Sequence, residues 1–185
     1  MRRKAVTTEM LKAELAESLL RLMAEKPFAE ITVREIAEGA GVDRSTYYRH
    51  FTTREDVLED YLDGVVSRYI DQVDRQAGRL ESLCGMFTFF AGYRRELLLL
   101  HDNGQANLLL RVLARRIVAV NQADCYRIAY HLGGLFSVFL RWFEQRMADP
   151  PEKMALIVDN LLPDSFQPLL QRAAVPVVRE TEKGV

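Results

Sequence analysis

The stretch from Arg44 to Arg54 carries side chains that suit an anionic, hydrogen-bonding partner. It contains three arginines and one histidine, no carboxylate, and hydroxyl groups from serine, threonine and tyrosine between them. Arginine can donate two hydrogen bonds to a guanine edge, and hydroxyl groups can bond to bases or to phosphate oxygens. This composition predicts a contact with the major groove of duplex DNA.

Two short helices are predicted to position these side chains. Thr32 and Glu35 form a T-x-x-E capping box, and Ile31 and Ile36 occupy the two positions of a hydrophobic staple. The first helix is therefore expected to open at Val33. Its buried face would carry the apolar residues that recur at helical spacing.

A tight turn is predicted after the first helix, at Gly41, because glycine adopts the left-handed conformation without steric cost. Asp43 is a suitable N-cap for a second helix from Arg44 to His50. Tyr47 and Phe51 lie four apart and are assigned to its buried face. A merely solvated basic helix would not need two closely spaced caps and a turn glycine, so a helix-turn-helix is the better interpretation.

This stretch resembles the N-terminal DNA-binding domain of the TetR/AcrR family of bacterial transcription regulators. The family pattern T-x-x-x-I-A-x-x-A-G-V-x-x-x-x-x-Y-x-x-F is met by Thr32, Ile36, Ala37, Ala40, Gly41, Val42, Tyr48 and Phe51. The resemblance implies an all-α fold, with a three-helix DNA-binding domain followed by a helical regulatory and dimerisation domain. It also implies that the DNA-facing residues are Thr32, Arg44, Ser45, Thr46, Tyr48, Arg49, His50 and Arg54.

Two of these residues depart from the family pattern. Arg54 stands where the family usually has lysine, which keeps the charge but changes the donor geometry. Arg44 is bulkier than the small residue that is common at its position. The operator sequence can therefore not be taken over from a relative.

The net charge of -1 is unevenly distributed along the chain. Residues 1–54 hold ten Lys and Arg against eight Asp and Glu, and the remaining residues hold fifteen against eighteen. An excess of positive charge at the front of the chain agrees with a nucleic-acid partner. Arg2, Arg3 and Lys4 could reach the DNA backbone, or could form only a frayed, solubilising terminus.

Other classes of function find little support in the sequence. Cys84 and Cys125 have no metal-binding spacing, and no phosphate-binding loop or nucleophile motif occurs, so we expect neither a metal, a cofactor nor catalysis. The longest apolar run, Leu132 to Leu140, ends at Arg141 and is too short to cross a membrane. A cytoplasmic protein with reduced cysteines is the simplest expectation.

Longer helices are expected to flank the helix-turn-helix. The first is predicted over Thr8 to Glu25, and a linking helix from about Thr53 to Gln76, preceded by a capping box of Thr52 and Glu55. The predicted domains are residues 1–54 for DNA binding and 55–185 for regulation and dimerisation. Helix breaks in the second domain are expected near Gly92, near Asn103 and Gly104, near Asn121, and at Asp149 to Pro151.

The last two predicted helices, Asp124 to Arg146 and Pro151 to Leu162, carry more apolar surface than one core requires. In the TetR family the last two helices commonly pair with those of a second copy, and these segments resemble that arrangement. The predicted homodimer interface consists of Leu135, Phe139, Trp142, Met154, Val158 and Leu161.

Aromatic residues of the second domain raise two possibilities, a ligand cavity or an ordinary core. The predicted ligand-binding residues are Phe87, Phe90, Tyr93, His101, Tyr126 and Tyr130. The expected function is a repressor that binds a palindromic operator as a homodimer under an effector's control. Two alternatives remain: control by a protein, as in the DhaS type of regulator that the C-terminal part loosely resembles, and a helical interaction protein without DNA binding.

Overall fold

The computed structural model describes residues 8–74, 76–118 and 125–162. Within them the chain is all-α, which confirms the predicted fold class. The helices are α1 (Thr8–Glu25), the 3-10 helix η1 (Phe28–Glu30), α2 (Val33–Gly39), α3 (Arg44–Tyr48), α4 (Arg54–Gln72), α5 (Arg79–Ala91), α6 (Arg94–Asp102), α7 (Asn107–Val118), α8 (Cys125–Glu144) and α9 (Pro151–Leu161). The predicted arm of Arg2, Arg3 and Lys4 and the predicted break at Asn121 lie outside the described residues.

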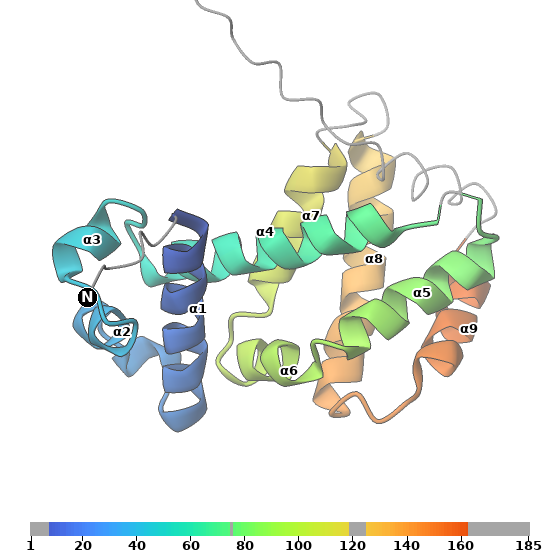
Figure 1. Cartoon of the computed structure of the whole chain (residues 1–185). Coiled ribbons are helices and arrows are strands. Elements are labelled where there is room, and N and C mark those ends of the chain that lie inside the picture. The colour runs from blue at the N-terminus through green and yellow to red at the C-terminus, as the bar shows by residue number, and fades with distance from the viewer. Residues whose placement is uncertain (1–7, 75, 119–124, 163–185) are drawn as a thin grey trace, which may run out of the picture.

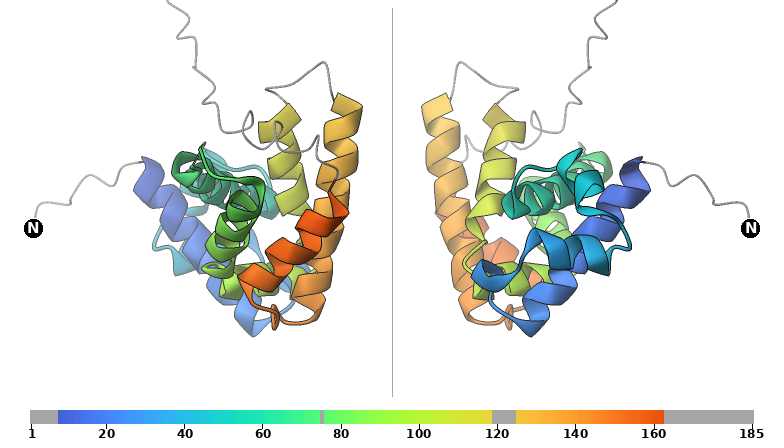
Figure 2. Two further views of the ribbon diagram at one scale, coloured as in Figure 1. Left: turned by 90° about the vertical axis from the view of Figure 1, so that its right-hand side faces the viewer. Right: turned by 90° about the vertical axis from the view of Figure 1, so that its left-hand side faces the viewer.

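The helices form a head and a body that are joined by α4 (Figure 1). α1, α2 and α3 make the head at one end, and α4 runs from it into the body of α5 to α9. In the body α9 packs on α5, and α7 packs on both α4 and α8. The two side views in Figure 2 show α8 and α9 along one flank of the body. α4 therefore links the head mechanically to the body.

α1 packs closely on α2 because a glycine and a serine meet at the crossing. Leu15 and Leu19 of α1 are fully buried, as the periodicity predicted. The buried Ser18 hydroxyl donates to the Ile36 carbonyl at 2.9 Å. A Cβ built on Gly39 would lie 2.3 Å from the Ser18 Oγ, which is too close for two unbonded atoms. Gly39 is thus required by this contact, which joins residues 18 and 39 and which no local sequence pattern indicates.

Gly39→Ala is expected to lower the stability of the protein by about 1 to 3 kcal/mol, the usual cost of overpacking. Gly85→Ala is the matched control, because a Cβ at Gly85 meets nothing within 4 Å and lies inside helix α5. That change should stabilise the chain by about 1 kcal/mol, the difference in helix propensity. Thermal unfolding of both variants decides the matter; equal effects would show that the Ser18 contact is not tight.

α4 begins one residue later than expected and ends earlier. Its capping box is formed by Thr53 and Asp56, so the predicted pairing of Thr52 with Glu55 is wrong. Both pairs fit the sequence pattern. In the structure the Asp56 carboxylate accepts from the amides of both Thr52 and Thr53, and the helix begins at Arg54. At the other end the backbone leaves the helix at Val73, in place of the predicted end at Gln76, and turns back toward α5.

The body has an aromatic core that contains most of the residues predicted to face a partner. The Phe87 ring stacks on Phe139 at 5.0 Å between ring centres and meets Trp142 edge-on at 5.4 Å. Five of the six predicted interface residues are buried within this single chain: Leu135, Phe139, Trp142, Met154 and Val158. An apolar stripe shows that a face is buried, but not whether its own core or a partner covers it.

Candidate nucleic-acid interface

The start of α2 is held by the predicted capping box. The Thr32 hydroxyl accepts from the Glu35 amide at 3.3 Å, and the Glu35 carboxylate accepts from the Thr32 amide at 2.9 Å. The Thr32 hydroxyl also donates to that carboxylate, at 2.8 Å. Thr32 is exposed, so a phosphate could approach it, but its hydroxyl is already engaged.

The turn after α2 has the geometry that the sequence predicted. Gly41 has a φ of 68°, in the left-handed region that favours glycine. The amide of Gly41 donates to the Glu38 carbonyl at 3.1 Å, and that of Val42 to the Ala37 carbonyl at 3.0 Å. These bonds close the end of α2 and direct the chain into α3.

The carboxylate of Glu35 is held in its ionised form. The Lys26 ammonium lies 2.6 Å from one of its oxygens. This hydrogen bond, followed by those from the backbone and hydroxyl of Thr32, lowers the pKa of Glu35 from 4.5 to about 2. The ionised group therefore connects the end of α1 to the start of α2.

The contribution of Glu35 to stability is expected to depend on pH. A carboxylate whose pKa is lowered by folding stabilises the protein above its ordinary value of 4.5, and this is lost as the pH falls toward about 2. Glu35→Gln should therefore melt below the unchanged protein at pH 7, with the gap closing between pH 5 and pH 2. Melting curves across that range test this, and a gap that stays constant would contradict it.

Tyr47 anchors α3 to the head. Its side chain is fully buried, and its hydroxyl donates to the Thr53 carbonyl at 2.7 Å. Burial raises the pKa of Tyr47 to about 12, so the hydroxyl stays protonated. Phe51 is buried as well, with its ring 6.0 Å from that of Tyr47. The prediction that both residues belong to the core is confirmed.

The outward side of α3 carries the predicted polar surface. The exposed residues are Arg44, Ser45, Tyr48 and Arg49, while Thr46 and His50 are half-buried. Arg49 donates to the Thr46 hydroxyl at 3.1 Å, which orders two of these side chains. α3 ends at Tyr48, two residues before the predicted end. Asp43 stands at the N-cap, but its side chain makes no capping bond.

Arg54 points into the head and away from the surface of α3. Its guanidinium donates to the carbonyls of Phe28 at 2.8 Å, of Ala29 at 3.3 Å and of Ile31. It also lies 4.8 Å from the centre of the Phe28 ring. Arg54 was predicted to face DNA, but its guanidinium is held by backbone carbonyls of the head. All three carbonyls accept from Nη1 of Arg54. The planar guanidinium also lies over the Phe28 ring, a stacking contact for which the ammonium of the lysine usual in the family lacks the shape.

The six predicted ligand-binding residues do not surround one cavity. Phe87 and Phe90 are buried in the aromatic core, whereas Tyr126 and Tyr130 of α8 are 90% and 79% exposed. The hydroxyl of Tyr93 accepts from Arg68, and His101 packs edge-on against Phe143. The prediction that these residues line one cavity is therefore wrong, because helical spacing does not show which faces of different helices meet.

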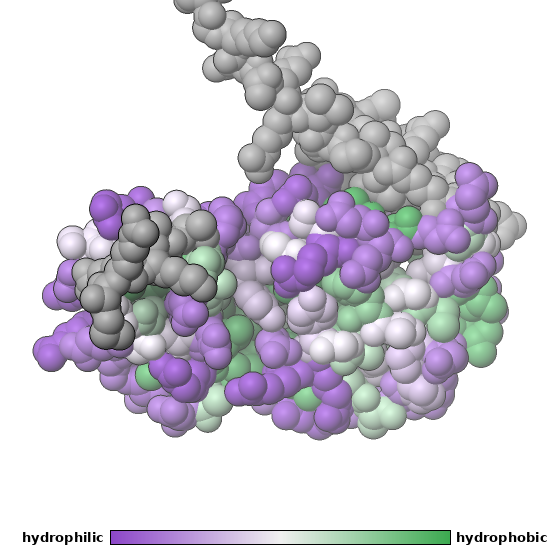
Figure 3. Space-filling model, in the orientation of Figure 1, coloured by the Kyte–Doolittle hydropathy of each residue, from purple (hydrophilic) through white to green (hydrophobic). Residues whose placement is uncertain are grey.

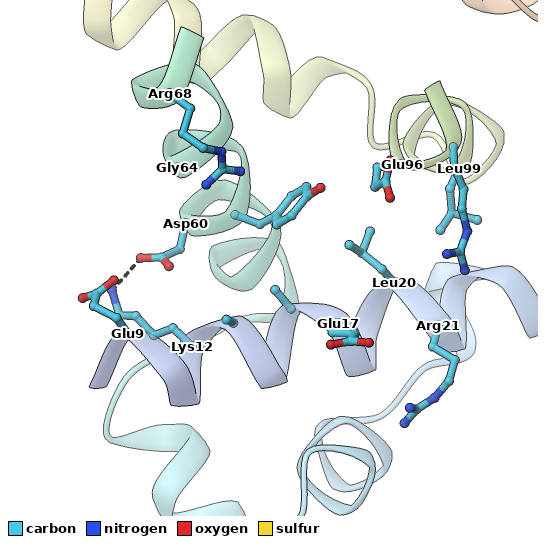
Figure 4. Close-up of a pocket in the computed structure, with 14 residues that line it drawn as sticks. Glu9, Lys12, Glu17, Leu20, Arg21, Asp60, Gly64, Arg68, Glu96 and Leu99 are labelled. Carbon is cyan, nitrogen blue, oxygen red and sulfur yellow. Dashed lines mark hydrogen bonds and ion pairs between the residues drawn. The ribbon is translucent and has the colours of Figure 1, made fainter. Parts of the chain in front are cut away.

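Two pockets are instead lined by other residues. One of about 570 Å³ lies among α1, α4 and α6, and Figure 4 shows that Lys12 and Asp60 pair across its edge. The second, of about 500 Å³, lies between the end of α4 and α5 and includes Tyr69, Phe89 and Cys84. Neither contains any of the six predicted residues.

The described residues offer little support for other kinds of site. No helix among them combines the length and apolar character that a membrane crossing requires. In the same part of the chain no three or more histidine, cysteine, aspartate or glutamate side chains gather in a way that could hold a metal ion.

Comparison with known proteins agrees with the geometry of the head. The profile of the family described as "Bacterial regulatory proteins, tetR family" matches residues 15–61, from within α1 to within α4. The HTH-type transcriptional repressor KstR2 of Mycobacterium tuberculosis is 36% identical over 91 residues, which are 47% of this chain and 46% of that protein. The HTH-type transcriptional regulator EthR of Mycolicibacterium smegmatis is 39% identical over 56 residues, 30% of this chain and 26% of EthR.

A third relative aligns along nearly the whole chain. The uncharacterized HTH-type transcriptional regulator YxbF of Bacillus subtilis is 25% identical over 194 residues, 96% of this chain and 51% of YxbF. The chain thus spans about half the length of the curated relatives it matches, or less.

The capped α2, the glycine turn and the outward basic side of α3 have the geometry of a helix-turn-helix, a motif that places its second helix in the major groove of DNA. The profile of the TetR family matches this unit over residues 15–61, so the helix-turn-helix of this chain is similar to that of the TetR family of bacterial regulatory proteins.

Proposed function

We propose that this protein is a repressor that binds a palindromic operator as a homodimer and releases or retains it in response to an effector. The observation that carries the proposal is the row Arg44, Ser45, Tyr48 and Arg49, exposed on a helix whose other side is anchored by the buried Tyr47. Residues at the start of a recognition helix contact base edges, and phosphate contacts set its register. The name of KstR2 supports repression as the direction of control.

The proposed dimer surface is the outer side of α8 and α9. Tyr126 and Tyr130 are exposed on α8, and Ile157 and Leu161, one turn apart, are exposed on α9. Figure 3 shows hydrophobic residues gathered at the edge of the body where α9 lies. Exposed apolar groups of this kind favour association with a partner. Leu161 is the one residue of the predicted interface that remains a candidate.

The proposed effector site is the pocket between α4 and α5. Tyr69 and Phe89 line it, with ring centres 5.3 Å apart, beside the half-buried Cys84. Concave sites with a largely apolar lining and a few polar groups are typical of small-molecule binding. An occupant would contact the last turns of α4. The first turn of α4 follows α3 in the chain, after a short connection.

Selection of duplexes from a random library by the purified protein tests the proposed function. We expect enrichment of an inverted repeat whose half-site centres are about 34 to 36 Å apart, one turn of the double helix. Affinity should fall as salt rises, because the protein displaces counterions from phosphates. Selection that enriches no sequence at low or moderate salt would rule the proposal out.

A further inference from the structure

α6 is tied at both ends to the residue that follows the last turn of α8. Arg94, its first residue, donates to the carbonyl of Arg146 at 2.7 and 3.2 Å. Asp102, its last residue, accepts from the Arg146 guanidinium at 2.7 and 2.8 Å. Arg146 has a φ of 57°, which is uncommon for a residue other than glycine, so this reversal has a specific conformation. α6 is therefore attached to the end of α8.

Asn103, which directly follows α6, joins this unit to the head. Its Oδ1 accepts from the amide of Phe28 in η1 at 2.8 Å. Its Nδ2 donates to the carbonyl of Met23 in α1 at 3.3 Å and to that of Leu99 in α6 at 3.0 Å. One half-buried amide group thus uses an acceptor and two donors to connect three helices.

Asn103 and Arg54 both bind η1. Arg54 bonds the carbonyls of Phe28 and Ala29 and is the first residue of α4. In Figure 1, α6 lies between α1 and the end of α8. Residues of α1 and α6 also line the pocket that is shown in Figure 4. Leu99, whose carbonyl accepts from Asn103, also lines this pocket, so the attachment lies close to its border.

We propose that Asn103 is a positioning residue that sets the orientation of the DNA-binding head relative to the body. This inference rests on the proposed function and deepens its regulation. The proposed chain of contacts runs from the end of α8 through Arg146 and α6 to Asn103, and from there to η1 and Arg54. It does not pass along the helix α4. A change in the α8 surface or in the pocket beside α6 would reach the recognition helix by this route.

Amide hydrogen exchange of the full chain tests the route without DNA. Asn103→Ala should speed exchange of the Phe28 amide about 2- to 12-fold, the factor that corresponds to the net worth of one hydrogen bond. Asp102→Ala, which touches neither Phe28 nor Met23, should speed the same amide if α6 transmits its position. Asn107→Ala, an exposed asparagine at the start of α7, is the matched control and should leave that amide unchanged.

Binding to the selected duplex tests the consequence for the head. The unchanged protein should prefer one spacing of the half-sites over spacings longer or shorter by one base pair. Asn103→Ala should lower this preference at least 5-fold, the lower end of typical coupling between sites, while a single half-site is bound as before. If Asn103→Ala only lowered the stability of the protein, binding to duplexes of every spacing would fall by the same factor.

Asn103→Asp provides a second variant if the alanine variant does not fold. A carboxylate still accepts from the Phe28 amide of η1, but it repels the carbonyls of Met23 in α1 and Leu99 in α6, so only the bond to η1 remains. The proposal is overturned if both variants keep the spacing preference, or if Asp102→Ala leaves exchange of the Phe28 amide unchanged. Failure to select any duplex refutes the proposed function. The exchange measurement alone then tests whether Asn103 connects α6 to the head.

Discussion

Arg44→Ala is expected to abolish the preference for one base pair in each half-site of the operator. Arg44 is the first residue of α3 and is exposed, and the described residues show no ion pair that engages its guanidinium. A recognition helix reads bases with its N-terminal residues, and loss of one such contact costs about 1 to 3 kcal/mol. In a homodimer the loss occurs twice, so affinity should fall about 30- to 20,000-fold, the square of the factor for one half-site.

The measurement is a set of titrations with the selected duplex and with duplexes substituted at each position of the half-site. Arg95→Ala is the matched control, because it removes one exposed arginine from α6 in the body and leaves α3 intact. The control should weaken all duplexes slightly and equally. If Arg44→Ala retains the preferences of the unchanged protein at every position, Arg44 does not read bases.

Leu161→Asp is expected to convert the proposed homodimer into a folded monomer. Leu161 is 67% exposed, so a carboxylate there leaves the core of the chain intact, but it would lie within the proposed interface. Burial of a leucine side chain is worth about 1.5 to 3 kcal/mol, and a buried carboxylate adds a desolvation penalty. Loss of the second head should lower operator affinity by about 100- to 10,000-fold, because bivalent binding is lost.

Sedimentation at micromolar concentration and circular dichroism together test this prediction. Leu156→Asp is the matched control: Leu156 is 51% exposed on the same helix, but on a different side of it. We expect the control to remain a dimer with the same helix content. A monomer from Leu156→Asp combined with a dimer from Leu161→Asp would place the interface on the other side of α9.

Phe139 cannot serve the same purpose, although the sequence pattern assigned it to the interface. Its ring is buried between Phe87, Phe90 and Trp142, so a charge there would disrupt the core of the body. Removal of a buried aromatic side chain costs about 3 to 5 kcal/mol. Loss of dimer in such a variant would report unfolding and not an interface.

Local features of the head could be predicted from the sequence because their interactions span only a few residues. The capping box of Thr32 and Glu35, the left-handed Gly41 and the bounds of α1 all agree with the structure. Each depends on backbone hydrogen bonds within one helical turn and on the conformational freedom of a single residue. The register error at Thr52 arose where two neighbouring threonines satisfied the same local pattern.

Tertiary structure alone decided what each face and each charged group contacts. Arg54 was assigned to DNA from its type and position, and the carbonyls that hold its guanidinium lie 23 to 26 residues earlier in the chain. Asn103 looked like a helix break, and its amide bonds Phe28 and Met23, 75 and 80 residues away. The helix-turn-helix could be predicted without a structure, because caps, turns and hydrophobic periodicity are local. Partners that are distant in the chain are decided by the packing of whole helices, which no local pattern encodes.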